Sequence, residues 1–390
     1  MMGEKKKTTI SCLFLMGLLW LCSCGGPSSD SMQTARNGAE SEQAAQELVY
    51  ESSLVLQYAE NFSVDYYEGG YKILKTSDGT QILIVPEGKE VPGGMDEDVL
   101  VLKQPIENIY LVSSSVMDIF RELDAMDTIR FSAQKAENWY VAEAREAMEN
   151  GDILYAGKYS KPDYEMIVSG NCSLVIENMM ILHTPEVMEM LEDFGIPVMI
   201  EYSSYESHPL GRVEWIKFFG ALVDKEEEAE QAFERQAGIL EQVTSAEKTD
   251  KTVAFFFITS NGLAQVRQSS DYIPKMIELA GGRYIFEDLG DPGSKRSTVN
   301  MQLEEFYAGA KDADFLIYNS SIDGGVRSIA ELLEKCPVLA DFKAVQEGNV
   351  WCTTNDMYQQ SMSTGYLIED IHNMLVGTNE DEMRYLFRLE

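Results

Sequence analysis

The hydrophobic pattern is clearest in residues 224–247, where apolar side chains recur every three or four positions. One stripe collects Ala229, Ala232, Phe233, Gln236, Leu240 and Val243, which is typical of an amphipathic helix. At ~1.5 Å per residue such a helix would be roughly 36 Å long. Asp224 and Glu227 match a capping box at its start. We therefore predict one long helix over 224–247 that joins the segments on its two sides.

Residues 105–223 alternate short apolar runs with amphipathic segments. Strands buried on both faces are predicted at 108–113, 128–132, 173–177 and 197–201. Helices are predicted at 116–123, 139–150, from Pro162 onward, at 184–194 and at 209–223. This alternation indicates a mainly parallel sheet covered by helices on both faces.

The alternation begins again in residues 248–390. Strands are predicted at 252–259, 314–318 and 349–353, and helices at 272–280, 303–309, 329–334 and 363–375. The predicted fold class is therefore α/β, with two Rossmann-like lobes joined by one long helix.

Residues 51–104 have a different, β-rich pattern. Strand candidates lie at 55–59, 62–67, 71–76 and 81–85. Glu68-Gly69-Gly70 and Ser77-Asp78-Gly79 lie between them as hairpin turns. We interpret this stretch as an antiparallel β extension that precedes the first lobe.

The N-terminus has the pattern of a secretory leader. Three lysines precede an apolar run that is too short to span a membrane comfortably. The run ends in Leu21-Cys22-Ser23-Cys24, which resembles a bacterial lipoprotein cleavage site. We predict a leader over 1–24 ending at lipidated Cys24, a flexible tether over 25–50, and a periplasmic or cell-envelope protein held to a membrane by lipid. An ordinary signal peptide with incidental cysteines is the alternative.

Composition excludes one class of partner. The chain has 31 basic and 65 acidic residues, a net charge of −34, whereas nucleic-acid binding needs a basic surface. Docking on a basic protein surface is compatible with this charge.

Three cysteines follow Cys24, namely Cys172, Cys336 and Cys352. The odd number argues against a complete disulfide framework; Cys336 and Cys352 could pair, but we favour buried free thiols.

Motifs for catalysis are absent from the sequence. It contains no phosphate-binding loop, no GxGxxG, no GxSxG and no HExxH. His183, His208 and His372 are far apart, so a three-histidine zinc site would require the fold to gather them. We predict no catalytic residue, no metal site and no enzyme activity.

Several motifs, in order, resemble the solute-binding proteins of ABC importers for corrinoids and iron complexes such as ferric siderophores and haem. The resemblance covers about 106–375. Its carriers are Pro162–Ile167 followed by Leu174–Ile176, Gly195–Val198, Gly281-Gly282, Leu303–Phe306 with Ala313–Ile317, and Phe342–Val350. Asp163 stands where asparagine is common in that family, and Asn171-Cys172-Ser173 replaces Lys-Pro-Asp. The resemblance implies two lobes on a rigid helix, with ligand in the cleft.

The same resemblance implies a permease partner with an attached ATPase. In this family one glutamate on each lobe pairs with arginines of the permease, and the matching positions are Glu165 and Glu304. Such exposed pairs would set docking geometry and association rate. The alternative is that Glu165 only favours its helix dipole, and Glu305 is adjacent to Glu304. A monomer is expected.

Ligand contacts are expected on loops at the carboxyl ends of the strands. The candidates are Trp139, Tyr140, Tyr159, Asn178, Met179, Tyr202, Tyr205, His208, Arg212, Arg296, Asn319 and Trp351, with Ser114, Ser115, Met180, Asn261 and Ser320 beside them. Aromatic rings suit a flat macrocycle, and arginines suit carboxylate-bearing or catecholate-bearing chelates. His208 is either an axial metal ligand or a capping or cleft-wall residue. Tyr202 and Tyr205 are either phenolate ligands or a stacked wall.

These observations predict a binding protein that captures a metal chelate, either a corrinoid or a ferric complex, and delivers it to a permease. A carrier of free zinc or manganese would need clustered histidines and carboxylates. A sensor, or an enzyme on the same fold, is the other alternative.

Overall fold

The computed structural model describes residues 47–290 and 296–390. Residues 45–390 form one compact unit, and the fold below belongs to that unit. The predicted leader, Cys24 and most of the predicted tether lie outside the described residues. Within the described residues, no helix has the length and apolar character needed to cross a membrane.

The N-terminal lobe is built on a five-stranded parallel sheet with the strand order β12-β11-β6-β7-β8. Its strands are β6 (Ile109–Leu111), β7 (Ile129–Ser132), β8 (Leu154–Tyr155), β11 (Val175–Glu177) and β12 (Val198–Ile200). Its helices are α1 (Met117–Glu122), α2 (Ala142–Asn150), α3 (Tyr164–Ser169) and α4 (Pro185–Asp193), with a small ribbon of β9 (Gly157–Lys158) and β10 (Lys161–Pro162). The predicted parallel α/β lobe is therefore confirmed, with shorter strands than the apolar runs indicated.

The C-terminal lobe has a mixed sheet with a parallel centre. Its parallel strands are β13 (Thr252–Ile258), β15 (Arg283–Tyr284), β17 (Phe315–Tyr318) and β18 (Val350–Thr353). Antiparallel strands flank them: β14 (Ala264–Arg267), β16 (Thr298–Met301) and β19 (Leu386–Arg388). The sequence reading missed these three because each is short and carries polar residues. The helices are α7 (Tyr272–Leu279), α8 (Leu303–Ala310), α9 (Ile329–Lys335), α10 (Lys343–Glu347) and α11 (Thr364–Val376).

The β extension is a separate five-stranded sheet. Its strands, in order, are β1 (Tyr50–Ser53), β2 (Phe62–Tyr67), β3 (Tyr71–Thr76), β4 (Gln81–Val85) and β5 (Leu100–Lys103). The first four pair antiparallel, as predicted, but β5 lies parallel to β4. The predicted strand at 55–59 is wrong, because the backbone amides of Gln57, Tyr58 and Ala59 donate to the carboxylate of Glu214 instead of a neighbouring strand.

The long helix is real but begins later than predicted. It is α6 (Glu226–Thr244), which follows α5 (Pro209–Leu222), and all six residues of the predicted stripe are buried in it. The capping box is wrong. Asp224 has a φ of 57°, in the left-handed region that the tight α5–α6 turn requires, and its carboxylate lies 2.6 Å from Lys72 Nζ in the extension. The first helical turn therefore has no side-chain cap.

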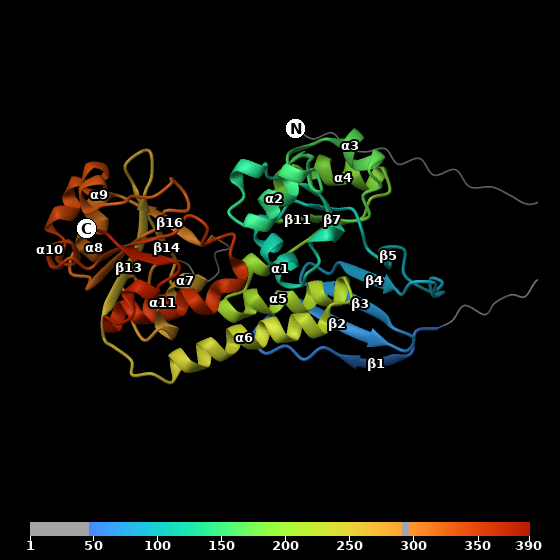
Figure 1. Ribbon diagram of the computed structural model, residues 1–390, viewed down its shortest axis with the longest axis horizontal. Coiled ribbons are helices and arrows are strands. Elements are labelled where there is room, and N and C mark those ends of the chain that lie inside the picture. The colour runs from blue at the N-terminus through green and yellow to red at the C-terminus, as the bar shows by residue number, and fades with distance from the viewer. Residues whose placement is uncertain (1–46, 291–295) are drawn as a thin grey trace, which may run out of the picture. The chain divides into compact units, whose positions relative to one another are not determined.

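Helix α6 contacts elements of both lobes, namely α5 along one part of its length and α11 along the other (Figure 1). At the α11 contact, Gly365 N–H donates to Gln236 Oε1 at 2.9 Å. A Cβ at Gly365 would lie 2.8 Å from that oxygen and 3.0 Å from the Gln236 carbonyl oxygen, so the close approach needs glycine.

The two lobes share a continuous hydrophobic core. One cluster of buried residues runs from the extension through the N-terminal lobe, α5 and α6 to one face of the C-terminal sheet, where it includes Phe255, Ile317 and Trp351. A second cluster covers the other face of that sheet. Cys172, Cys336 and Cys352 are buried and free, as we favoured from the sequence.

Candidate ligand-binding site

A cavity of about 590 Å³ lies where both lobes and the extension meet, within the size range of small-molecule sites, roughly 300–1,000 Å³. The N-terminal lobe contributes the loops that follow β11 and β12, at the carboxyl ends of parallel strands. The C-terminal lobe contributes the start of α7 and the segment before β16. The lining residues are Asn61, Ser77, Asp78, Met179, Leu182, Tyr202, Ser204, Tyr205, Glu206, Ser207, Ser270, Asp271, Tyr272, Arg296 and Ser297.

Two tyrosines form part of the N-terminal wall. Tyr202 and Tyr205 pack edge to face, with ring centroids 6.3 Å apart. The Tyr202 hydroxyl donates to Asp78 Oδ2 at 3.1 Å. Burial, followed by the charge of Asp78, raises the pKa of Tyr202 well above its ordinary value. A neutral phenol that donates to a carboxylate fits a wall residue better than a phenolate metal ligand.

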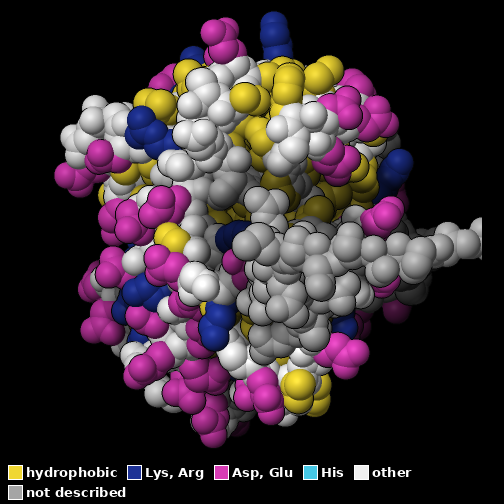
Figure 2. Space-filling model, turned by 90° about the vertical axis from the view of Figure 1, so that its right-hand side faces the viewer, with side chains coloured by type: hydrophobic (Ala, Val, Ile, Leu, Met, Phe, Trp, Pro, Cys, Tyr) yellow, Lys and Arg dark blue, Asp and Glu magenta, His cyan; other side chains and the backbone are white. Residues whose placement is uncertain are grey.

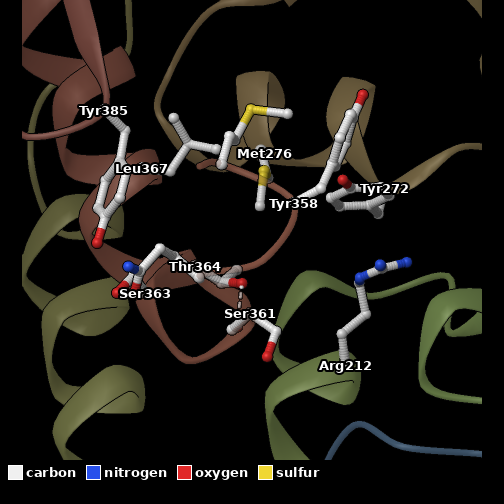
Figure 3. A pocket seen from close by; sticks show the side chains of 11 residues that line it. Arg212, Tyr272, Met276, Tyr358, Ser361, Ser363, Thr364, Leu367 and Tyr385 are labelled. Carbon is white, nitrogen blue, oxygen red and sulfur yellow. Dashed lines mark hydrogen bonds between the residues drawn. The ribbon is translucent and has the colours of Figure 1, made fainter. Parts of the chain in front are cut away.

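An arginine–tyrosine cluster lies beside this cavity. The Arg212 guanidinium, near the start of α5, stacks 4.0 Å from the centroid of the Tyr272 ring at the start of α7. Figure 3 shows Arg212 pointing toward Tyr272, and both residues line a small cavity of about 30 Å³. Ser204 O accepts a hydrogen bond from Arg212 Nη1 at 2.7 Å. One guanidinium from the N-terminal lobe is thus held against a ring of the C-terminal lobe.

Arg267 is a second guanidinium in the same cluster, and it is 8% exposed. It donates to the Tyr358 hydroxyl and lies 3.5 Å from Asp271 Oδ2. Burial alone would lower its pKa, but Tyr358 and Asp271 outweigh burial and raise it. Arg267 is therefore a fixed positive charge near the cavity, and the ion pair with Asp271 partly compensates this charge.

His208 lines an adjoining cavity of about 560 Å³. Its Nδ1 accepts the Leu210 N–H at 3.1 Å and so caps α5, while its ring stacks on Tyr58 of the extension at 4.4 Å. Burial, and then the charge of Lys275, lowers the pKa of His208. Since Nδ1 accepts, the neutral ring carries its proton on Nε2. An axial metal bond through Nε2 would therefore require the cap to be given up.

Glu177 stands out among the buried groups at the carboxyl end of the N-terminal sheet. Its side chain is 0% exposed, and neither carboxylate oxygen has a hydrogen-bond partner among the described residues. Burial raises the pKa of Glu177 to about 8. This carboxyl is therefore largely protonated at neutral pH.

The structure places the predicted ligand contacts in the main cavity, in the neighbouring cavities, or away from both. Met179, Tyr202, Tyr205 and Arg296 line the main cavity, and His208 and Arg212 line its neighbours. Trp139 and Trp351 are 1% and 2% exposed and belong to the core, which corrects their placement on the cleft wall. Asn319 is buried and bonds the Tyr358 hydroxyl at 2.9 Å. Tyr159 is half-buried against the core, and Asn178 caps the 3-10 helix Met179–His183.

Tyr140 lies at a contact between the lobes. Gln359 Oε1 accepts from its backbone N–H at 2.7 Å, and Gln359 Nε2 donates to Asn138 O at 2.9 Å. Nearby, the Ser361 hydroxyl donates to Ser115 O at 2.6 Å. The C-terminal segment that contains Gln359 and Ser361 therefore bonds the backbone of the N-terminal lobe at three points.

The two predicted docking glutamates occupy equivalent local positions. Glu165 lies in the first turn of α3, whose N-cap Asp163 accepts from Met166 N–H at 3.0 Å. Glu304 and its neighbour Glu305 lie in the first turn of α8. All three are exposed, so each is accessible to a partner, and exposure does not distinguish Glu304 from Glu305 as the docking residue.

The surface is strongly acidic. Figure 2 shows one face with Asp and Glu side chains gathered in its lower part and hydrophobic side chains in its upper part. Among residues 47–290 and 296–390, no group of three histidine, cysteine, aspartate or glutamate side chains is placed to hold a metal ion.

Sequence reasoning missed part of the site. Asn61, Ser77 and Asp78 come from the extension, which the sequence reading treated as separate from the cleft. The sequence predicts a turn at Asp78-Gly79, but the side chain that this turn presents to the cavity depends on how the extension packs. Arg267 and Tyr358 were missed because β14 was not predicted and because loop 354–360 carries no periodic pattern.

Comparison with known proteins places this geometry in context. A family model described as "Periplasmic binding protein" matches residues 109–357. An uncharacterized lipoprotein of Methanocaldococcus jannaschii is 24% identical over 97% of this chain and 99% of its own length. The haem-binding protein HutB of Vibrio cholerae has a TM-score of 0.55 at 16% identity, covering 67% of this chain and 97% of its own. The ABC-type Fe3+-hydroxamate transport protein of Saccharomonospora viridis has a TM-score of 0.54 at 19% identity, covering 70% and 93%. At these identities the two structures show a shared fold.

Proposed function

The chain belongs to the periplasmic binding protein family, and on that premise we propose that it is the substrate-binding lipoprotein of an ABC importer. It captures a metal chelate, either an iron complex such as a ferric siderophore or haem, or a corrinoid, in the cavity of about 590 Å³. It then delivers this chelate to a membrane permease.

The observation that carries the proposal is the composition of the cavity and its surroundings. Tyr202, Tyr205 and Tyr272 supply aromatic surface for a bulky ligand. Arg212 and Arg267 both hold positive charge against the Tyr272 ring, and Arg296 lines the cavity. Guanidinium groups are the natural partners of the carboxylates or catecholates of iron chelates.

Delivery would use the exposed acids. We assign Glu165 of α3 and Glu304 of α8 to docking on arginines of the permease, one on each lobe. We further propose that helix α6, which contacts both α5 and α11, keeps the two positions at a fixed separation, which a two-point dock requires. Lipid on Cys24 would hold the protein, as a monomer, at the membrane.

A ligand panel tests this function. Because residues 45–390 form one compact unit, a soluble chain without residues 1–24 is suitable. It would be titrated with haemin, cyanocobalamin, a ferric trihydroxamate and a ferric tricatecholate, and tyrosine and tryptophan fluorescence would be followed. Saturable quenching by at least one chelate is expected. Absence of quenching, confirmed by equilibrium dialysis, would overturn the ligand class.

A further inference from the structure

The β extension supplies part of the ligand cavity even though the family match begins only at residue 109. Asn61, Ser77 and Asp78 line the cavity together with residues of both lobes. Because the alignment with the lipoprotein of Methanocaldococcus jannaschii covers 97% of this chain, it must include most of residues 51–104. The extension thus lies outside the residues that the family model matches and mostly within those that align with this relative.

The turn between β3 and β4 is held firmly. Asp78 Oδ1 accepts from the Thr76 hydroxyl at 2.6 Å and from Thr80 N–H at 3.0 Å. Gly79 follows with a φ of +94°, a conformation that glycine adopts without strain. The Tyr202 hydroxyl bonds Asp78 Oδ2 from the N-terminal lobe. The direction of this carboxylate is therefore fixed from both sides.

The extension itself is anchored to the N-terminal lobe close to this turn. Glu206 accepts from Glu60 N–H and Asn61 N–H, both at 3.0 Å, and from Trp215 Nε1 at 2.9 Å. Glu214 accepts from the three preceding amides. These two buried carboxylates fix residues 57–61, and Asn61 O in turn accepts from Ser77 N–H at 3.0 Å.

Asp78 carries a full negative charge at neutral pH. Partial burial alone would raise its pKa, but the hydrogen bonds from Thr76, Thr80 and Tyr202 lower it below the ordinary value. The other carboxylates of the cavity are much less accessible, since Glu206 is 3% exposed and the Asp271 side chain, which pairs with Arg267 and caps α7, is 6% exposed. Asp78 also accepts three donors, but it is exposed and lines the cavity.

We propose that the β3–β4 turn is a specificity element of the ligand site, in which Asp78 accepts from an ammonium, amide or hydroxyl group of the chelate and disfavours an anionic group there. This inference rests on the proposed function, and it adds that the end of the ligand facing the extension carries hydrogen-bond donors. The chelate would place its anionic groups toward the arginines and its donor groups toward the extension.

Replacing Asp78 by asparagine tests the charge while keeping an oxygen that can accept from Thr76 and Thr80. Affinities would be measured for a ferric trihydroxamate with a free ammonium group and for haemin, which carries two carboxylates. The ratio of the two dissociation constants should shift about tenfold in favour of haemin, the scale expected for one charge at close range in a partly exposed site. Asp98→Asn is the matched control, because it removes the same charge at an exposed position outside the lining residues.

The outcomes separate the two proposals. If the wild-type chain binds neither probe nor any other chelate of the panel, the proposed function fails and this inference fails with it. If the wild-type chain binds, but Asp78→Asn shifts the ratio no more than Asp98→Asn, only the role of Asp78 is overturned.

A second measurement tests contact with the turn. The three cysteines after Cys24 are buried, so Ser77→Cys can be labelled selectively with an environment-sensitive dye on the chain without residues 1–24. Glu68→Cys is the control, since it lies at the other end of β3, roughly 20 Å away at ~3.3 Å per residue. Ligand should change the signal at residue 77 at the same concentrations that quench intrinsic fluorescence. Equal or absent changes at both positions would overturn the proposal.

Discussion

Replacing Glu214 by alanine should loosen the extension and strongly destabilise the protein. Glu214 is fully buried in α5. Its two oxygens accept from Gln57, Tyr58 and Ala59 N–H at distances from 2.8 to 3.1 Å. Alanine removes all of these acceptors at once and leaves three backbone N–H groups without them.

The expected cost follows from the loss of a buried charged acceptor. A hydrogen bond to a charged group contributes roughly 1.5–3 kcal/mol, and removing one partner of a buried charged network costs about 3–5 kcal/mol. Lys217, 3.6 Å from Glu214, would keep Glu230 as its partner at 2.9 Å. The Lys217 charge is therefore not left alone, and we expect about 3–4 kcal/mol. Glutamine at this position, which keeps an acceptor oxygen but brings an NH₂ group toward the donors, should cost less than alanine.

Urea unfolding followed by circular dichroism would measure the change, and limited proteolysis would locate it. The first cleavage in Glu214→Ala is expected within residues 54–61. Glu137→Ala is the control, since its side chain is 69% exposed, its partner Lys135 is 55% exposed, and such an exposed ion pair contributes about 0–1 kcal/mol. If Glu214→Ala cost no more than Glu137→Ala, or if the extension stayed protected, the anchoring role would be refuted.

Three further predictions concern titration, capping and docking. The pKa of Glu177 is about 8 in the fold against 4.5 ordinarily, so as the pH rises the unfolded chain releases this proton before the folded chain does. The free energy of unfolding should therefore fall as the pH rises from about 4.5 to about 8, by up to about 1.4 kcal/mol per pH unit. Glu177→Gln should remove that slope in pH-dependent thermal unfolding, and parallel wild-type and variant curves would contradict it. His208→Asn, which keeps a helix cap, should leave the absorbance spectrum of a bound chelate unchanged, whereas a shifted metal band would identify His208 as a ligand. Glu165→Ala and Glu304→Ala should reduce uptake in cells carrying the permease without changing chelate affinity, and a loss of affinity would argue against docking.

The sequence predicted those parts of the fold that depend on local periodicity. The stripe from Ala229 to Val243 is buried as expected, since a 3.6-residue period places one face of a helix against a core whatever that core contains. The apolar runs around β11, β13 and β17 likewise gave buried parallel strands.

What the sequence could not predict is decided by contacts between distant segments. Asp224 is of a residue type, and at a position, that suits a helix N-cap, but a tight turn and Lys72 of the extension determine its conformation. Glu214 looks like an ordinary polar position in α5, yet backbone N–H groups more than a hundred residues away donate to its buried carboxylate and offset the cost of burying it. Trp139 and Trp351 illustrate the reverse error, because a large aromatic residue near a loop more often fills a core than lines a cleft.

The central claim is that the cavity shared by the two lobes and the extension holds the chelate. Amide hydrogen exchange of the chain without residues 1–24, with and without saturating haemin, cyanocobalamin or the ferric trihydroxamate, tests it most directly. The account predicts that a chelate which binds will slow exchange in residues 76–80, 179–182, 202–207 and 270–272, the segments that line the cavity. Protection confined to other segments, or no protection with any of the three, would contradict it.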